Sequence, residues 1–138
     1  MSQPAPGKPA ARKGDAVVGL DIHVLMIPSP AGPIPTPTPL PFTGVLGDAL
    51  SADVKVENKP VALVGSVADN TPVHVPAGGP FQKPPANKAT IKTGSGSVFA
   101  NNKKVAVLGS TADTCADPMD GPNGSVIGTA TTVLVGGA

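Results

Sequence analysis

Three side chains in this 138-residue sequence could bind a soft or borderline metal ion. His23, His74 and Cys115 are the only histidine and cysteine residues in the chain. Imidazole nitrogen and thiolate sulfur suit tetrahedral zinc, and iron is a second option. Their spacing is not that of a zinc finger. The prediction of a metal site therefore depends on where these residues stand in an internal repeat.

Each of the three residues follows a Gly-Asp or Gly-Ser dipeptide at short distance, and an alanine stands three residues before each glycine. The dipeptides begin at Gly14, Gly65 and Gly109. His23 and His74 both lie nine residues after their glycine, and Cys115 lies six residues after its own. Three copies of one unit, each ending near a metal-binding side chain, predict approximate threefold symmetry that converges on one metal ion.

The fourth ligand stays open at this level, although a structural zinc site normally has four protein ligands. The candidates are a water molecule and four side chains: Asp21, Asp113, Asp117 and Met119. Most carboxylates stand beside Gly, Ser or Pro, which is typical of turns. No nucleophile motif of the G-x-S-x-G kind is convincing. We therefore expect no catalytic residues and a non-enzymatic protein. A small zinc-dependent hydrolase with an open metal position is the alternative.

The composition argues against several classes of protein. A net charge of +1 and an aromatic content of 2 % are unfavourable for nucleic-acid binding, which uses basic surfaces and stacking platforms. Gly and Pro are abundant, with 17 and 18 residues, as in many disordered chains. A mean hydropathy of +0.13 and a charged fraction of 14 % oppose disorder. Short strands separated by turns fit both the high Gly and Pro content and the low charge. A Pro-rich adaptor is a further alternative for the function.

A β-hairpin pattern occurs twice and a split copy occurs once. Residues 53–63 (DVKVENKPVAL) and 97–108 (SVFANNKKVAVL) share alternating apolar positions around a turn. Residues 132–137 resemble the first strand of this hairpin, and residues 8–11 resemble its second strand. We expect the two ends of the chain to pair, which removes a free sheet edge. No apolar period near 3.6 is sustained, so we expect an all-β domain with little helix.

The length predicts one domain, over residues 9–138, after a loose Pro-rich tail at residues 1–8. Within the domain, residues 28–41 (PSPAGPIPTPTPLP) are expected to form a polyproline II loop that wraps a surface. Proline at every second position is incompatible with a helix, and it removes backbone N–H groups that would donate hydrogen bonds to a neighbouring strand. The N-terminus lacks the apolar core of a signal peptide. This predicts synthesis and assembly in the cytoplasm.

Several motifs, taken in order along the chain, resemble one known family. Residues 9–12 spell Pro-Ala-Ala-Arg, the tetrapeptide that names the PAAR-repeat family, and Gly14-Asp15 follows as it does there. Further motifs that resemble the family's repeats are Asn58-Lys59-Pro60-Val61-Ala62, Gly94-Ser95 before a strand, Asn102-Lys103 and the closing TVLVGG of residues 132–137. The resemblance covers the chain from about residue 8 to the C-terminus.

The resemblance implies a cone-shaped β protein that caps a membrane-puncturing spike. Such spikes belong to type VI secretion systems, contractile phage tails and extracellular contractile injection systems. The broad base would dock on a trimeric VgrG-like spike protein, with one chain per trimer. The tip would meet the target membrane mechanically. The protein would be assembled in the cytoplasm and delivered at the tip of the apparatus, with the 1–8 tail or the Pro-rich insert recruiting any effector cargo.

The resemblance also implies a metal ion, usually zinc, at the sharp vertex. Histidines and a cysteine bind it in the family, and the matching residues here are His23, His74 and Cys115. The family typically uses three histidines and one cysteine. This chain is one histidine short, so the resemblance leaves the fourth ligand open as well.

Overall fold

The computed structural model describes residues 7–136 as strands, turns and loops, and these residues contain no helix. The described part of the chain thus offers no helix able to cross a bilayer. This confirms the predicted all-β fold. The strands are β1 (Lys8–Pro9), β2 (Ala16–Ile27), β3 (Ile34–Asp48), β4 (Lys55–Val56), β5 (Lys59–Pro60), β6 (Val67–Asn70), β7 (Lys88–Ile91), β8 (Phe99–Ala100), β9 (Lys103–Lys104), β10 (Thr111–Thr114), β11 (Gly121–Ile127) and β12 (Leu134–Val135).

The six longest strands form one closed antiparallel sheet in the order β2-β3-β6-β7-β10-β11. Chain order and spatial order agree, so the sheet consists of three successive strand pairs. The first strand of each pair begins two residues after one of the repeat glycines, which are Gly14, Gly65 and Gly109. These glycines have φ values of 90°, 100° and 90°, a left-handed conformation that glycine adopts without steric cost. The repeat read from the sequence therefore marks the entry into each pair.

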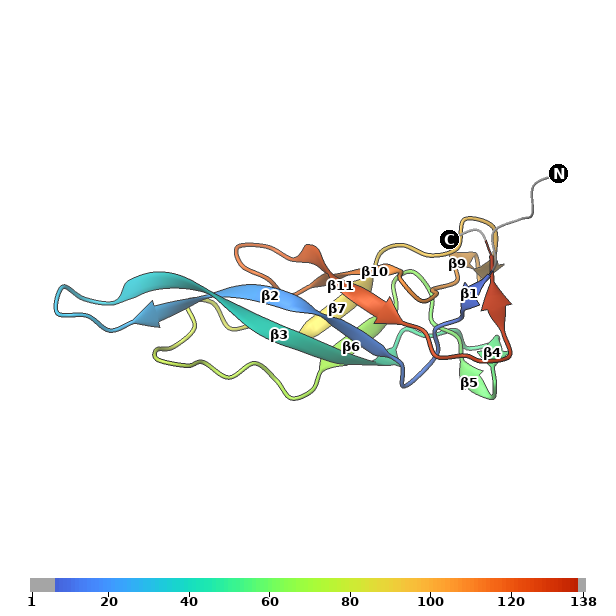
Figure 1. Ribbon diagram of the computed structural model, residues 1–138, viewed down its shortest axis with the longest axis horizontal. Helices are drawn as coiled ribbons and strands as arrows, with labels where there is room; N and C mark the ends of the chain where they lie inside the picture. Colours follow the sequence, from blue (N-terminus) through green and yellow to red (C-terminus); the bar gives the residue numbers. More distant parts are fainter. Residues whose placement is uncertain (1–6, 137–138) are drawn as a thin grey trace.

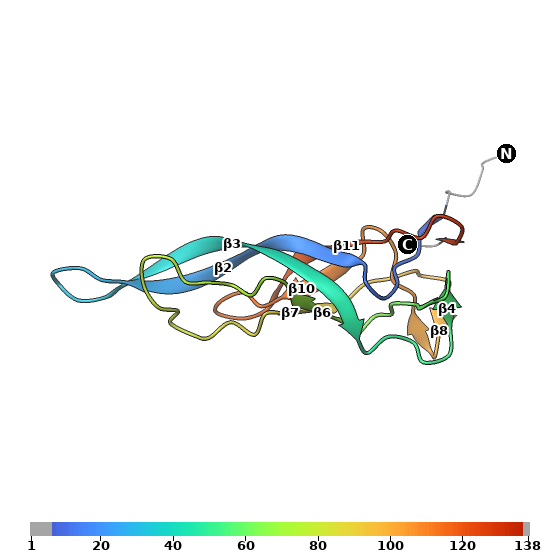
Figure 2. The same ribbon diagram turned by 90° about the horizontal axis from the view of Figure 1, so that it is seen from below.

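The remaining six strands form three small two-stranded sheets at one end of the elongated molecule (Figure 1). β4 pairs with β5, and β8 pairs with β9. β12 pairs with β1 through Lys8↔Val135 and Pro9↔Leu134, so the two ends of the chain meet as expected. We call this end, with its three small sheets, the base. At the opposite end the β2–β3 hairpin projects alone (Figure 2).

Three alanines join the base to the closed sheet by a cyclic set of backbone hydrogen bonds. The amide of Ala11 donates to the carbonyl of Ala106, that of Ala106 to Ala62, and that of Ala62 to Ala11, each over 2.9 Å. All three side chains are fully buried. Because each alanine occupies the same place in its repeat, the chain closes on itself with approximate threefold symmetry.

Two apolar clusters lie along the axis of the molecule. One fills the closed sheet around Phe42, Leu46 and Ile91. The other lies beneath the small sheets of the base, around Val61, Val105 and Val107. The first cluster includes six alanines besides its larger residues, because a closed sheet of six short strands leaves little room inside: Ala11, Ala62, Ala68, Ala89, Ala106 and Ala112. Small side chains let the backbones approach the axis closely.

The Pro-rich segment is a strand, which corrects the expectation of a wrapping loop over residues 28–41. Residues 34–41 begin β3 and pair with β2 as far as Ile27↔Ile34, so only residues 28–33 form a turn. The backbone groups of Val24 and Met26 in β2 bond to residues 80–82, away from β3. The prolines opposite Val24 and Met26 therefore occupy non-hydrogen-bonded pairs. At such a position the backbone N–H of any residue would point away from β2, so its absence in proline removes no hydrogen bond between β2 and β3. Alternate proline is thus compatible with an outer strand.

The predicted tail of residues 1–8 lies mostly outside the described residues, and its last residue, Lys8, already belongs to β1. The closing segment of residues 132–137 also ends outside them, at Gly137. Within the described range, the closed sheet and the base share the cyclic hydrogen bonds of Ala11, Ala62 and Ala106, which we call the alanine ring, and their apolar clusters adjoin. Residues 8–136 therefore form one continuous unit.

Candidate metal centre

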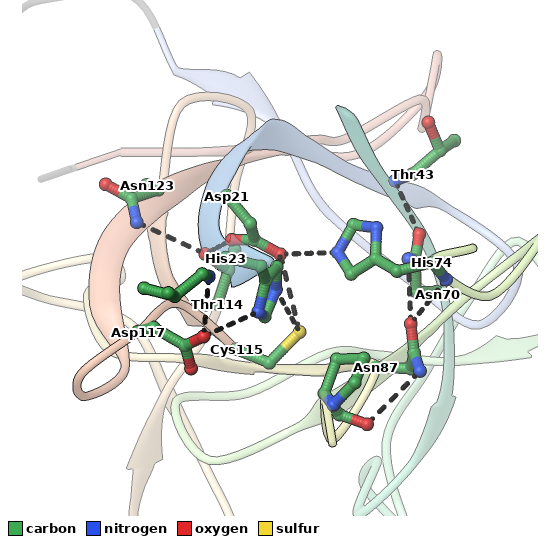
Figure 3. A network of polar contacts seen from close by, with 12 residues as sticks. Asp21, His23, Thr43, Asn70, His74, Asn87, Thr114, Cys115, Asp117 and Asn123 are labelled. Carbon is green, nitrogen blue, oxygen red and sulfur yellow. Dashed lines mark hydrogen bonds and ion pairs between the residues drawn. The ribbon is translucent and has the colours of Figure 1, made fainter. Parts of the chain in front are cut away.

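Four buried side chains meet inside the closed sheet, from three of its strand pairs: Asp21, His23, His74 and Cys115. Each contributes one potential ligand atom, and these atoms all lie within 4.8 Å of one another. Figure 3 shows the four side chains pointing toward a common centre. The structure therefore brings together the three residues singled out in the sequence and adds an aspartate. This cluster could hold a metal ion.

Strand alternation places two of the four groups. Successive side chains of a strand point to opposite faces, so Asp21 and His23 share the inner face of β2. Both are completely buried, whereas Leu20 and Ile22 between and beside them are exposed. An Asp-x-His pattern in a strand with an otherwise apolar inner face is a signal that sequence reasoning could have used to choose Asp21 as the fourth ligand.

The Asp21 carboxylate is the centre of the cluster. Its Oδ2 atom lies 2.9 Å from His74 Nε2, 3.4 Å from Cys115 Sγ and 3.8 Å from His23 Nε2. Cys115 Sγ and His23 Nε2 are 3.8 Å apart. In tetrahedral zinc sites, bonds of about 2.0–2.3 Å separate neighbouring ligand atoms by roughly 3.3–3.7 Å. The distances of Cys115 Sγ and His23 Nε2 from Asp21 Oδ2 and from each other are close to this range, and the whole set, within 4.8 Å, would have to contract by up to about 1 Å to coordinate one ion.

Polar side chains around the cluster hold Asp21 in place. Its other oxygen, Oδ1, accepts a hydrogen bond from the Thr114 hydroxyl, and Asn123 Nδ2 donates in turn to Thr114 at 3.4 Å. This division leaves Oδ2 free to face the imidazoles and the thiol (Figure 3). Hydrogen bonds to the non-ligating atoms of a ligand typically fix its orientation in metal sites.

His74 follows β6 in a loop, and two asparagines fix that loop. The His74 amide donates to Asn87 Oδ1 over 2.8 Å, and Asn70 Nδ2 donates to the same oxygen over 3.1 Å. Asn70 Oδ1 accepts a hydrogen bond from the Thr43 amide of β3. The loop is therefore tied to both neighbouring strands. Asn87 has a φ of 57°, a left-handed conformation that asparagine tolerates better than most residues.

Cys115 directly follows β10 and is almost fully buried. Burial, and next the negative charge of Asp21, raise the pKa of the Cys115 thiol to about 11. Without a metal ion the thiol is therefore protonated at neutral pH and donates to Asp21 Oδ2. Coordination requires the thiolate, so binding of a metal ion would release this proton. The positive charge of the ion would then compensate the buried negative charges of the Cys115 thiolate and the Asp21 carboxylate.

The chemistry of the donor set fits a borderline cation. Two imidazole nitrogens, one sulfur and one carboxylate oxygen are all ligands that zinc accepts. The rings of His23 and His74 lie 4.8 Å apart, centroid to centroid, at 59°. Phe81 packs edge-on against His23, and Phe42 packs edge-on against His74. These apolar walls limit access of water to the cluster.

The other fourth-ligand candidates lie elsewhere. Asp113 is on the outside of β10 near Lys92, and Met119 is 72 % exposed in the loop before β11. The side chain of Asp117 is only 6 % exposed, but it lies behind His23 rather than within the cluster: its Oδ2 atom is 3.6 Å from His23 Nδ1. Apart from the Asp-x-His pattern that favours Asp21, the sequence does not separate the candidates, because it does not show which loop ends return to the axis.

The cluster lies within the closed sheet and not at the extreme end of the molecule. The family resemblance implies a metal at the sharp vertex, but His23 stands four residues before the end of β2. At about 3.3 Å per residue, the hairpin continues roughly 13 Å beyond it. The difference arises because the Pro-rich segment extends the first hairpin past the other two pairs, as Figure 1 shows.

Comparison with protein families, with curated proteins and with solved structures finds no match to this chain.

Proposed function

We propose that this protein is a structural, non-enzymatic tip of the PAAR type, stabilised by a zinc ion, that caps a trimeric VgrG-like spike. The observation that carries the proposal is the cyclic hydrogen bonding of Ala11, Ala62 and Ala106, which gives one chain an approximately threefold base. A homotrimer ends in three identical surfaces. A single chain can match all three at once only if it repeats one motif three times.

The base offers groups suited to such contact. Lys55, Phe99 and Leu134 occupy the same position in the three small sheets, as their paired registers show. Phe99 is 56 % exposed and Leu134 is 59 % exposed. Short strands with free edges can also pair with strands of a partner. An approximately threefold surface with exposed apolar groups supports docking on a threefold partner.

The proposed metal has a structural role in this scheme. The ion would join side chains of β2, of the loop after β6 and of the residue after β10. Four protein ligands would complete a tetrahedral zinc shell, which is typical of structural rather than catalytic sites. Burial of all four side chains supports the same reading and gives little support to a hydrolase with an open metal position. Iron remains the second choice of cation for this donor set.

The decisive experiment measures stoichiometry with a VgrG-like trimer from the same genome. We expect native mass spectrometry to find one chain of this protein per spike trimer. The substitution Leu134→Glu should weaken the complex at least tenfold, because it places a charge in the apolar contact. Thr36→Ala, on the distant hairpin, is the matched control and should bind normally. Three chains per trimer, or no effect of Leu134→Glu, would contradict the proposal.

A further inference from the structure

Two hollows in the described part of the molecule reach ligands of the metal cluster. The larger, which we call the apolar hollow, has a volume of about 270 Å³, and its walls include His74, Leu40, Pro41, Val73 and Val75. The smaller, which we call the acidic crevice, has a volume of about 40 Å³, and its walls include Cys115, Lys83, Pro85, Ala86, Asp117 and Asp120. Figure 3 shows His74 and Asp117 on opposite sides of the cluster.

The two hollows differ in charge. Apart from His74, the walls of the apolar hollow consist of aliphatic residues, prolines, a threonine and an asparagine, and none of these carries a formal charge. The acidic crevice contains the carboxylates of Asp117 and Asp120, and only the ammonium group of Lys83 offsets them. A cleft in which one sign of charge prevails concentrates the field and raises the local concentration of ions of opposite sign. A divalent cation is therefore attracted to the acidic crevice.

Asp117 is fixed between the acidic crevice and the cluster. Its amide donates to the carbonyl of Ile22 over 2.8 Å, and its Oδ2 atom accepts a hydrogen bond from the Val24 amide over 3.0 Å. The same oxygen lies 3.6 Å from Nδ1 of His23, a buried nitrogen without a hydrogen-bond partner. The crevice therefore ends at one ligand, Cys115, and at the carboxylate that lies behind a second ligand, His23.

Packed side chains cover the cluster on other sides. The ring of Phe81 lies edge-on to that of His23 at 5.8 Å between centroids, and the ring of Phe42 lies edge-on to that of His74 at 6.2 Å. None of the four ligand residues is more than 9 % exposed, so an ion has to cross a wall to reach them. A water molecule needs about 10–15 Å³ of such space. The acidic crevice thus has room for an ion that has lost part of its hydration shell.

We propose that a divalent cation enters and leaves the metal centre through the acidic crevice, where exposed Asp120 attracts it at the mouth. The proposal rests on the metal centre of the proposed function and goes beyond it, because neither the donor set nor the threefold base determines how an ion reaches its ligands. An ion passes the same mouth in both directions. The charge of Asp120 therefore speeds uptake and release alike, and it changes the equilibrium affinity less than either rate.

The first measurement is the rate of zinc release, because it uses the metal-loaded protein. Zinc-loaded protein is mixed with a chromophoric chelator at concentrations where the rate no longer depends on the chelator. Ala86→Trp places a large side chain in the acidic crevice and should slow release by at least about tenfold. Val75→Trp places the same side chain in the wall of the apolar hollow, at a residue that is 69 % exposed. This matched control should release zinc at the wild-type rate.

The second measurement tests the charge of Asp120. Asp120→Asn should slow zinc uptake and zinc release about 3–10-fold at 0.01 M salt. The difference from the wild type should disappear at 1 M salt, because the Debye length falls from about 30 Å to about 3 Å. Asp53→Asn removes an exposed carboxylate at the base and is the matched control, which should change neither rate. Equal effects of the two substitutions would overturn the role of Asp120.

Melting temperature and zinc content show whether each variant is folded and loaded. If Ala86→Trp misfolds, Ala86→Leu serves in its place and should slow release severalfold. Release that Ala86→Trp leaves unchanged, or that Val75→Trp slows equally, would overturn the route and leave the metal centre standing. Release at the rate of global unfolding in every variant would overturn it too. A chain that binds no zinc would overturn the metal centre along with the route.

Discussion

Asp117 places its Oδ2 atom 3.6 Å from Nδ1 of His23, on the side of the imidazole that faces away from the metal cluster. His23 Nδ1 is buried and has no hydrogen-bond partner at that distance. The same carboxylate oxygen accepts a hydrogen bond from the Val24 amide at 3.0 Å, so Asp117 is already fixed to β2. A small shift of the ring would complete an Asp–His–metal arrangement, which orients the ligand and raises its basicity.

This geometry predicts that Asp117→Asn weakens metal binding without unfolding the protein. The asparagine keeps an oxygen for the Val24 amide but loses the charge that supports His23. We expect about a 10–100-fold loss in zinc affinity, measured by competition with a chromophoric chelator. Asp113→Asn is the matched control, because Asp113 lies outside the cluster, and it should bind zinc normally. Equal affinities of the two variants would contradict a supporting role for Asp117.

Removal of the metal should lower thermal stability. One zinc or iron ion per chain is expected by elemental analysis of protein purified without added metal or chelator. A ligand present at 1,000 times its Kd stabilises the folded state by about 4.1 kcal/mol, or roughly 12–16 °C for a domain of this size. Chelation, Cys115→Ser and His74→Ala should each remove a stabilisation of this order. Met119→Leu, at a candidate ligand that is exposed, should remove none.

The alanine ring should not tolerate larger side chains. Ala62 is fully buried where three backbone segments meet, so Ala62→Leu forces these segments apart. Overpacking of this kind costs typically about 1–3 kcal/mol. Chemical denaturation should show the loss as a lower midpoint with an unchanged slope. Ala52→Leu, at an exposed position in the same chain segment, is the control. A similar loss of stability in this variant would show that the alanine ring is no more sensitive to a larger side chain than an exposed position.

Glu57 should make stability depend on acid pH. Its carboxylate accepts hydrogen bonds from the side chain and amide of Thr132 and the amide of Thr131, and it forms an ion pair with Arg12. These contacts, led by the Thr132 hydroxyl, lower the pKa of Glu57 from 4.5 to about 2. Because folding favours the ionised form, this stabilisation is complete above about pH 4.5 and disappears as the pH falls through 2.

The measurement compares the melting temperatures of the wild type and Glu57→Gln in the presence of chelator, which removes the effect of acid on metal binding. The wild type should melt higher at pH 6, and the difference should shrink between pH 4.5 and 2. A difference that is constant across this range would show that the charge of Glu57 does not contribute.

Much of the architecture could be read from local patterns. Glycines that must adopt positive φ, each with an alanine three residues earlier, repeat along the chain, and they mark the entries to β2, β6 and β10. The split hairpin predicted the pairing of β1 with β12. These features are local consequences of backbone conformation and side-chain alternation, so a sequence displays them directly.

The sequence by itself determined the all-β class, the threefold repeat and the three residues His23, His74 and Cys115. Only the tertiary structure selected Asp21 over the other candidate ligands, assigned Asp117 to the support of His23 and made the Pro-rich segment a strand. The physical reason is that a ligand is chosen by which atoms converge from distant strands. Likewise, proline is acceptable in a strand only when its missing N–H faces an unpaired side, and neighbouring segments decide which side that is.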